Sequence, residues 1–263
     1  MNTTLKLIEN RRSIRKYSNE SITPEEKDLI LSATLRAPTA GNMMLYSIIE
    51  VNDQEIKNKL AESCDHQPFI AKAPWVLLFL ADYQRWWDYY QHSQVNEFCK
   101  EKNLLYREPG EGDVLLACCD ALIAAQTAVI AAESLGIGSC YIGDILENYE
   151  FHRELFALPQ YVLPITVLCL GKPDIQTVQQ RKSPRFEREY IVFKNTYKEL
   201  DGFALEQMFQ PTQERYFNEG GSMGGAQNFG QFNYQRKFSA DFSIEMTRSV
   251  KEMLKNWAGV SHT

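Results

Sequence analysis

The run WVLLFLA, from Trp75 to Ala81, is the stretch that decides the fold. Apolar residues in unbroken succession over strand length are typical of a central strand covered on both faces. The run LPITVLCL, Leu163–Leu170, predicts a second buried strand of the same kind. Shorter segments are expected to add a strand at Tyr46–Val51, a strand or turn at Ser139–Ile142, and a last strand at Tyr190–Phe193.

Helices are expected on both sides of these strands in the sequence. The tetrapeptide TPEE at residues 23–26 combines an N-cap threonine, a proline at the first helical position and acidic residues in the first turn. This helix should run to about Arg36 and stop at Pro38. Further helices are expected at Gln54–Ser63, Val114–Leu135 with Gly136 as its C-cap, Phe151–Phe156 and Ser243–Trp257.

The composition limits the class of protein. A chain of 263 residues that is 44% hydrophobic can bury a sizeable core in one domain, with or without an extension. The net charge of −6 argues against nucleic acid or an anionic membrane as partner. The polar start and the interrupted apolar run Val114–Leu135 favour a chain with neither signal peptide nor membrane span. Scattered cysteines and histidines predict a reduced cytoplasmic protein without a metal site.

The chain divides by composition into a main part and an arm. Residues 1–200 are expected to form the main domain, with an aromatic-rich excursion at 84–113 that could serve either dimer packing or a substrate lid. Residues 201–263 read as a C-terminal extension with a glycine-rich connector at 219–230 and a helix at 243–257. The arm is expected to pack on the body or on a second subunit.

A cluster of cationic side chains lies near the amino terminus, in Arg11-Arg12-Ser13-Ile14-Arg15. On a helix, Arg11 and Arg15 would share a face at the i, i+4 spacing. Each guanidinium is a planar fork that matches phosphate or carboxylate oxygens. The segment therefore predicts either a phosphate-binding site or, on composition alone, a solvated basic patch at a helix start.

The glycine-rich segment GIGSCYIG, Gly136–Gly143, follows a helix and precedes a strand. This order is the reverse of a dinucleotide-binding turn, which follows a strand and opens a helix. We therefore expect its glycines to let backbone amides approach a flat ligand, because glycine has no Cβ.

Taken together, these motifs resemble the FMN-dependent nitroreductase family, in particular the NAD(P)H-linked nitro and flavin reductases with a C-terminal arm. The resemblance covers about Leu7–Tyr197 and, more loosely, the arm. The segments that carry it are Arg11–Arg15, Ala37–Asn42 running into Tyr46–Ile49, Ala131–Gly138, Tyr141–Gly143, Leu170–Pro173 and Arg181–Arg185. It implies an α+β fold whose central, mainly antiparallel sheet is flanked by helices, and an intertwined homodimer.

The resemblance also implies a role for individual residues. Arg11, Arg12 and Ser13 would hold the phosphate and ribityl chain of FMN, and Arg15 would be the catalytic residue that faces the N1/O2 edge of the ring. The remaining cofactor-binding positions are Pro38, Thr39, Ala40 and Asn42 on the partner's cofactor, Gln67 at the ribityl or ring edge, Tyr141, Ile142 and Gly143 near N5/O4, and Arg181, Lys182 and Arg185 at the phosphate.

Two positions depart from the family pattern. Met44 stands where the family usually has glutamine, so an amide contact to the flavin or substrate edge is replaced by an apolar thioether. Asp144 stands where a second glycine often follows Tyr141-Ile142-Gly143, and its carboxylate could alter which substrates approach.

The implied activity is a ping-pong electron transfer from NADPH or NADH through FMN to a nitroaromatic, a quinone or a free flavin. An aromatic-walled pocket would separate such planar acceptors by only about 1–3 kcal/mol. Two alternatives stay open at this point. One is a specialised enzyme of the same fold, such as a reductive dehalogenase or a flavin-fragmenting enzyme, and the other is a flavin-binding module without turnover.

Overall fold

The computed structural model describes residues 1–174, 184–218 and 224–259. By its internal contacts the chain forms two compact units. One consists of Met1–Gln179 together with Glu245–Thr263, and the other of Gln180–Ile244. Each unit is described by itself below.

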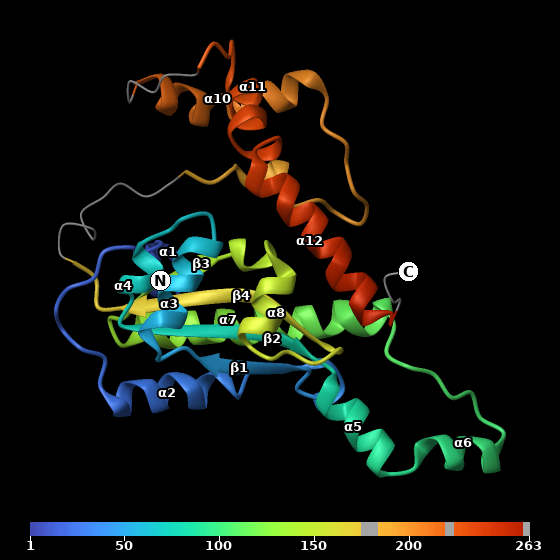
Figure 1. Cartoon of the computed structure of the whole chain (residues 1–263). Helices are drawn as coiled ribbons and strands as arrows, with labels where there is room; N and C mark the ends of the chain where they lie inside the picture. Colours follow the sequence, from blue (N-terminus) through green and yellow to red (C-terminus); the bar gives the residue numbers. More distant parts are fainter. Residues whose placement is uncertain (175–183, 219–223, 260–263) are drawn as a thin grey trace. The chain divides into compact units, whose positions relative to one another are not determined.

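A four-stranded antiparallel sheet lies at the centre of the first unit (Figure 1). Its strands, in spatial order, are β1 (Tyr46–Glu50), β2 (Trp75–Asp82), β4 (Val162–Gly171) and β3 (Gly138–Ile142). The register between β2 and β4 shifts between Phe79 and Leu80, where Leu80 lies opposite Pro164. Since proline has no N–H for the ladder, a bulge beside it is the expected way to keep it in a central strand.

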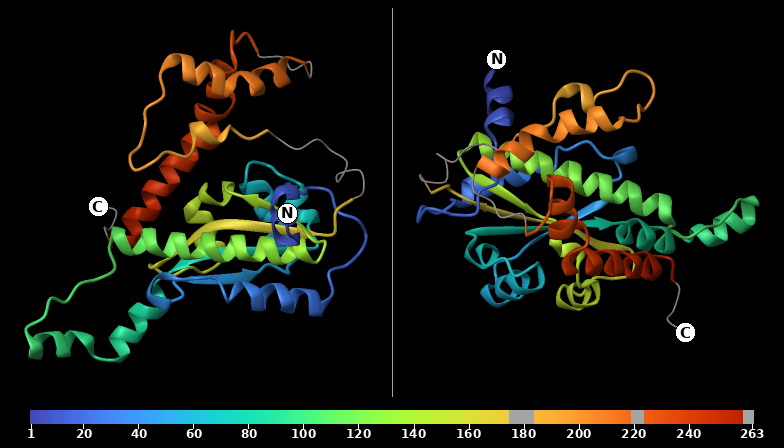
Figure 2. Two further views of the ribbon diagram at one scale, coloured as in Figure 1. Left: turned by 180° about the vertical axis from the view of Figure 1, so that it is seen from behind. Right: turned by 90° about the horizontal axis from the view of Figure 1, so that it is seen from above.

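Both faces of the sheet are covered by helices, as the unbroken apolar run of β2 predicts. Trp75, Leu77 and Phe79 point into one core cluster, and Val76 and Leu78 point into the other. The first cluster is closed by α2 (Pro24–Thr34) and α7 (Glu111–Ser134), and the second by α3 (Gln54–Ser63) and α4 (Phe69–Lys72). Figure 2 shows these two layers on opposite sides of the strands. The predicted α+β architecture is therefore confirmed.

The long helix α7 packs on the sheet through its alanines. Ala117, Ala121, Ala124, Ala125 and Ala128 are fully buried, and their small side chains let the helix backbone approach the strands. Its other side is apolar as well, with several exposed leucine and isoleucine side chains. Within the described ranges it is also the one helix whose length and apolar composition would suffice for a membrane span, a test that central core helices pass as well.

The helix starts agree with the local sequence signals. At α2, Thr23 Oγ1 accepts from Glu26 N and the Glu26 carboxylate accepts from Thr23 N, which is a complete capping box. At the end of α7, Gly136 adopts φ +72°, the left-handed conformation of a helix-terminating glycine. The remaining elements are α1 (Thr3–Asn10), η1 (Ala40–Asn42), α5 (Gln84–His92), α6 (Val95–Lys102), η2 (Asp144–Leu146), α8 (Tyr149–Leu155), η3 (Arg188–Tyr190), α10 (Gly202–Asn218), α11 (Phe229–Asn233), η4 (Tyr234–Phe238) and α12 (Asp241–Trp257).

Two local expectations are wrong. The arginine segment is not helical, because α1 ends at Asn10 and the chain continues extended with Ser13 in a parallel bridge to Ser139. The strand expected at Tyr190–Phe193 is also absent from the described residues, where η3 ends at Tyr190 and a turn follows. Ile191 and Val192 are exposed there, and a β-branched run without a partner strand has nothing to pair with.

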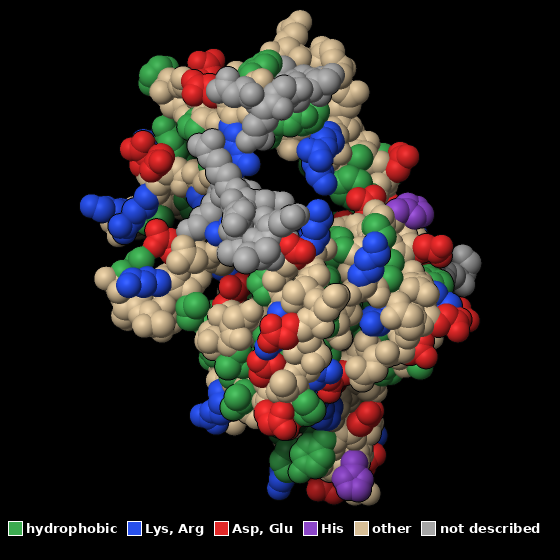
Figure 3. All heavy atoms as spheres, turned by 90° about the vertical axis from the view of Figure 1, so that its left-hand side faces the viewer, with side chains coloured by type: hydrophobic (Ala, Val, Ile, Leu, Met, Phe, Trp, Pro, Cys, Tyr) green, Lys and Arg blue, Asp and Glu red, His purple; other side chains and the backbone are tan. Residues whose placement is uncertain are grey.

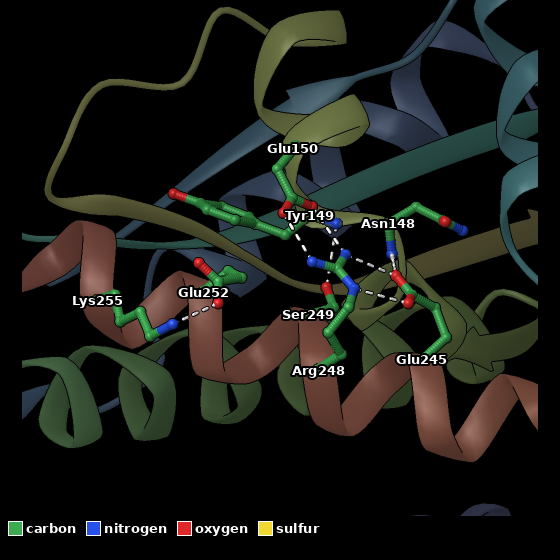
Figure 4. Close-up of polar contacts among 8 residues, drawn as sticks. All are labelled: Asn148, Tyr149, Glu150, Glu245, Arg248, Ser249, Glu252 and Lys255. Atoms are coloured by element: carbon green, nitrogen blue, oxygen red, sulfur yellow. Dashed lines mark hydrogen bonds and ion pairs between the residues drawn. The ribbon is translucent and has the colours of Figure 1, made fainter. Parts of the chain in front are cut away.

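The last helix, α12, is attached to the first unit by both polar and apolar contacts (Figure 4). Glu245 Oε1 accepts from Asn148 N at 3.1 Å and Ser249 Oγ accepts from Tyr149 N at 3.0 Å, so side chains of α12 satisfy N–H groups at the start of α8. Met253 and Trp257 are almost fully buried in a third core cluster. The end of the arm thus packs on the body of its own chain.

The second unit has an aromatic cluster of its own. Tyr216 lies 4.4 Å from Phe232 between ring centroids, and Phe186 lies 5.0 Å from Phe209 in an edge-to-face arrangement. The part of the expected glycine-rich connector at 219–223 lies outside the described residues, and Gly224 and Gly225 just after it both have positive φ.

Candidate functional site

The arginine segment is extended and lies beside β3, the edge strand of the sheet. Ile14 N donates to Ser139 O at 2.9 Å, and further on Ser18 N donates to Lys172 O at 2.9 Å. Ile14 is buried against Gly138, at which a Cβ would overlap its side chain. Ser13 and Arg15, on either side of Ile14, are exposed, as the alternation of side chains along an extended chain predicts. Gly138 is therefore required by the packing of Ile14, a reason that the sequence did not show.

The charged groups of this region converge around Cys140 in β3. Burial raises the pKa of the Cys140 thiol, while Arg15, a hydrogen bond with Ser13 and Arg11 lower it, and Asp144 raises it. Three predicted site residues of the arginine segment therefore act on one thiol of β3, which lies more than 120 residues away in the sequence. No ion pair joins Arg11 or Arg15 to a carboxylate among the residues that the structure describes, which leaves both guanidiniums for a ligand.

The loop between α3 and α4 and the first residue of α4 lie next to the arginine segment. The Arg15 guanidinium carbon lies 5.7 Å from the centroid of the Phe69 ring, within the range of a cation–π contact. Asp65 and His66 both adopt positive φ, which turns the chain sharply just before Gln67. Gln67 Nε2 then donates to Cys64 O at 3.0 Å and to Asp144 Oδ2 at 2.7 Å. Nothing in the sequence marked Phe69, whereas Asp144 already stood out as a departure from the family pattern.

The end of β3 presents backbone to the same region. Tyr141 is half-buried and its hydroxyl donates to Gln126 Oε1 at 3.3 Å. The Ile142 side chain is buried, so only its backbone can take part in a site. Gly143 is exposed, and a Cβ there would meet no atom within 4 Å. Open space thus begins where the strand ends.

The loop with Pro38, Thr39, Ala40 and Asn42 is held by Asp120, in the first half of α7. The buried carboxylate of Asp120 accepts from Ala40 N at 2.9 Å and from Leu45 N at 3.0 Å. Gly41, Asn42 and Met44 have positive φ, so the loop is tightly folded and Asn42 is exposed. Asp120 and Glu133, the latter close to Arg11 and Arg12, are 13 residues apart on α7, which is about 20 Å along the helix axis. Within one chain the proline loop and the arginine segment therefore do not meet.

The third group of predicted cations is only partly visible. Arg181 and Lys182 lie outside the described residues. Arg185 belongs to the second unit, is exposed, and donates to Pro184 O at 3.3 Å. Its part in a phosphate site stays a prediction.

A buried acidic residue, Glu147, lies close to Asp144. Burial, followed by the negative charges of Asp144, Asp65 and Glu245, raises the pKa of Glu147 to about 7. Its Oε1 is buried and has no hydrogen-bond partner among the residues that the structure describes. On the face drawn in Figure 3, basic and acidic side chains of the visible described residues are interspersed.

Comparison with known proteins supports one family. The model of the Nitroreductase family matches residues 8–172. An FMN reductase (NAD(P)H) from Bacillus subtilis (strain 168) is 34% identical over 220 residues, which cover 83% of this chain and 84% of that protein. An oxygen-insensitive NADPH nitroreductase from Salmonella typhimurium is 32% identical over 224 residues, covering 84% and 85%. The solved structure of the NADPH:FMN oxidoreductase from Vibrio harveyi complexed with NAD+ is similar with a TM-score of 0.76 at 27% identity, covering 96% of this chain and 98% of that one.

Proposed function

The chain belongs to the nitroreductase family of oxidoreductases, and from this premise we propose that it is an FMN-dependent enzyme that passes electrons from NAD(P)H to small planar acceptors. Nitroaromatics, quinones and free flavin are the acceptors that such a site would take. The single observation that carries the proposal is that Arg11, Ser13 and Arg15 act on Cys140 in β3, while Gln67 is bound to Asp144 just beyond the same strand.

The donor set fits the chemistry of a flavin mononucleotide. Arg11, Arg12 and Ser13 offer charged and neutral donors for a phosphate and hydroxyl groups. The exposed backbone at Gly143 leaves room for the flat edge of a ring system. When bound, the flavin would supply the ring that takes a hydride from the nicotinamide and gives it to the acceptor. The protein supplies position and electrostatics.

Arg15 is the residue that we assign to catalysis. Its side chain is exposed, and its guanidinium lies over the Phe69 ring. A fixed cation beside the N1/O2 edge of the isoalloxazine would stabilise the negative charge that builds up when the ring is reduced. This contact is stronger with the reduced cofactor than with the oxidised one, so it favours electron uptake.

We further propose that two copies of the chain build each site. The outer side of α7 exposes Leu115, Leu122 and Ile123, and α1 exposes Leu5 and Ile8. Apolar surface on this scale is typical of an interface between subunits. Since the proline loop lies about 20 Å along α7 from the arginine segment, the loop would serve the cofactor of the partner subunit. The six free cysteines suit a reduced, cytoplasmic setting.

The experiment that tests the proposal is an anaerobic stopped-flow titration of the purified flavoprotein with NADPH and with NADH. We expect the absorbance of the bound flavin to bleach within seconds with at least one donor, and to return when a nitroaromatic or quinone is added. Absence of bleaching with both donors would overturn the reductase assignment. Light scattering after gel filtration tests the dimer, and a monomer that binds FMN fully would contradict the shared site.

A further inference from the structure

The side-chain amide of Gln67 has its orientation fixed within the chain. Both protons on Nε2 are used, one by Cys64 O at 3.0 Å and the other by Asp144 Oδ2 at 2.7 Å. A carbonyl and an ionised carboxylate can only accept hydrogen bonds. Turning the amide over would therefore place Oε1 against two acceptors, at the cost of both bonds.

One polar atom of Gln67 remains for a ligand. The backbone N–H donates to Ala61 O at 2.7 Å, which leaves the side-chain Oε1. Among the residues that the structure describes, Oε1 has no recorded hydrogen-bond partner and is not one of the buried unpartnered atoms, so it is open to solvent. Gln67 thus offers an acceptor and no donor.

Asp144 is the variable part of this arrangement. It follows Gly143 at the open end of β3, 77 residues from Gln67 in the sequence. A residue without a side-chain acceptor at position 144 would leave one Nε2 proton free, and Gln67 could then donate as well as accept. The polarity of Gln67 toward the site therefore depends on a residue that only the folded chain brings beside it.

We propose that Asp144 is a positioning residue that makes Gln67 an obligate hydrogen-bond acceptor, and thereby selects the edge of the ligand that carries an N–H or O–H donor. The inference rests on the proposed function, which puts FMN in this site. On FMN such donors are the N3–H of the isoalloxazine and the hydroxyls of the ribityl chain. Gln67 is the residue that contacts the cofactor, and Asp144 acts through it.

The test compares dissociation constants of FMN with those of two analogues, 3-methyl-FMN, which lacks the N3–H, and 2′-deoxy-FMN, which lacks a ribityl hydroxyl. Flavin fluorescence reports binding without any turnover. We expect the wild-type protein to bind one analogue about 3- to 10-fold more weakly than FMN, as the loss of one hydrogen bond predicts. The analogue that is affected identifies which donor Gln67 meets.

Two substitutions at position 144 distinguish the negative charge of Asp144 from its capacity to accept a hydrogen bond. Discrimination here is the dissociation constant of the affected analogue divided by that of FMN. Asp144→Asn keeps an acceptor opposite Nε2, so this ratio should stay within twofold of the wild-type value. Asp144→Ala removes the acceptor, and the discrimination should fall at least threefold. Asp28→Ala, which removes an exposed carboxylate from α2, is the matched control and should change nothing. Thermal unfolding of each variant checks the fold.

A second variant keeps the inference falsifiable if Asp144→Ala does not fold. Gln67→Ala should abolish the discrimination while Asp144 is still present. Equal discrimination by wild type and Asp144→Ala, or by wild type and Gln67→Ala, would overturn the inference while FMN binding itself stood. A wild-type protein that binds no FMN would refute the proposed function, and the inference with it.

Discussion

Two buried carboxylates lie next to different parts of the proposed site, one beneath the proline loop and one close to Asp144, and the two differ. Asp120, beneath the proline loop, is 2% exposed, and its two oxygens accept from two backbone N–H groups. Glu147, three residues after Asp144, is 5% exposed, and among the described residues its Oε1 has no hydrogen-bond partner. Its surroundings add three further acidic side chains, Asp144, Asp65 and Glu245.

The difference indicates what each carboxylate contributes to its part of the proposed site. A carboxylate that satisfies backbone donors fixes the shape of a loop, because leaving those donors unpaired is expensive. A carboxylate that is buried among like charges instead makes its surroundings sensitive to pH. The proline loop thus supplies a rigid wall, whereas the acidic group around Glu147 gives the region of Asp144 a charge that depends on pH.

The largest expected effect comes from removing the shape-fixing carboxylate. Asp120→Ala leaves the N–H groups of Ala40 and Leu45 without their acceptor inside the protein. We expect a loss of about 3 kcal/mol in the free energy of unfolding, since each unsatisfied buried donor costs roughly 1–3 kcal/mol. Urea unfolding measures it. Asp113→Ala is a comparison at the start of the same helix, and an equal loss there would remove the special status of Asp120.

The second effect concerns pH and Glu147. Its folded-state pKa of about 7 lies above the unfolded value of 4.5, so this group makes the protein less stable as pH rises from about 4.5 to about 7. Glu147→Gln removes that dependence and should stabilise the protein at pH 8 by about 3 kcal/mol, with little change at pH 4.5. Unfolding in urea at both values tests this.

His152 provides the opposite slope as an internal control. Burial lowers the pKa of this imidazole to about 4 from 6.5, so the stability that it contributes is lost as pH falls through that interval. In Glu147→Gln the remaining dependence below pH 6.5 should therefore be a rise of stability with pH. A variant with the same pH profile as wild type would show that folding does not raise the pKa of Glu147.

The third effect is on the flavin and belongs to Arg15. Arg15→Ala should leave FMN bound but lower its two-electron midpoint potential by about 30 mV, which is a tenfold loss in the preference for the reduced form. The reason is the missing cation at the reduced ring. Lys16→Ala removes a neighbouring exposed charge and should shift the potential by a few millivolts only. Equal potentials for wild type and Arg15→Ala would remove Arg15 from its assigned role.

The sequence predicts those features of the fold and the site that depend on local signals, and it misses those that depend on contacts between distant residues. The four strands of the sheet and the helices α2, α3, α7 and α12 follow from apolar runs and cap residues, which are local signals. The helical spacing of Arg11 and Arg15 gave the wrong conformation, because the extended form depends on pairing of Ser13 with Ser139, far away in the chain. The contact of Arg15 with Phe69 had no local signal at all.

The smallest effect tests how α12 is attached to the start of α8, which follows Glu147 in the chain. Ser249 is fully buried and accepts from Tyr149 N, as an N-cap side chain would, so Ser249→Ala should cost about 1 kcal/mol. Arg248 makes ion pairs with Glu150 and Glu245 that look more extensive in Figure 4, yet they are partly exposed. Arg248→Ala should therefore cost about 0.5 kcal/mol. Hydrogen exchange at the Tyr149 amide separates the two cases, because only loss of the hydroxyl should accelerate it strongly. If Arg248→Ala accelerates this exchange as much as Ser249→Ala does, the ion pairs and not the buried hydroxyl attach α12 to the start of α8.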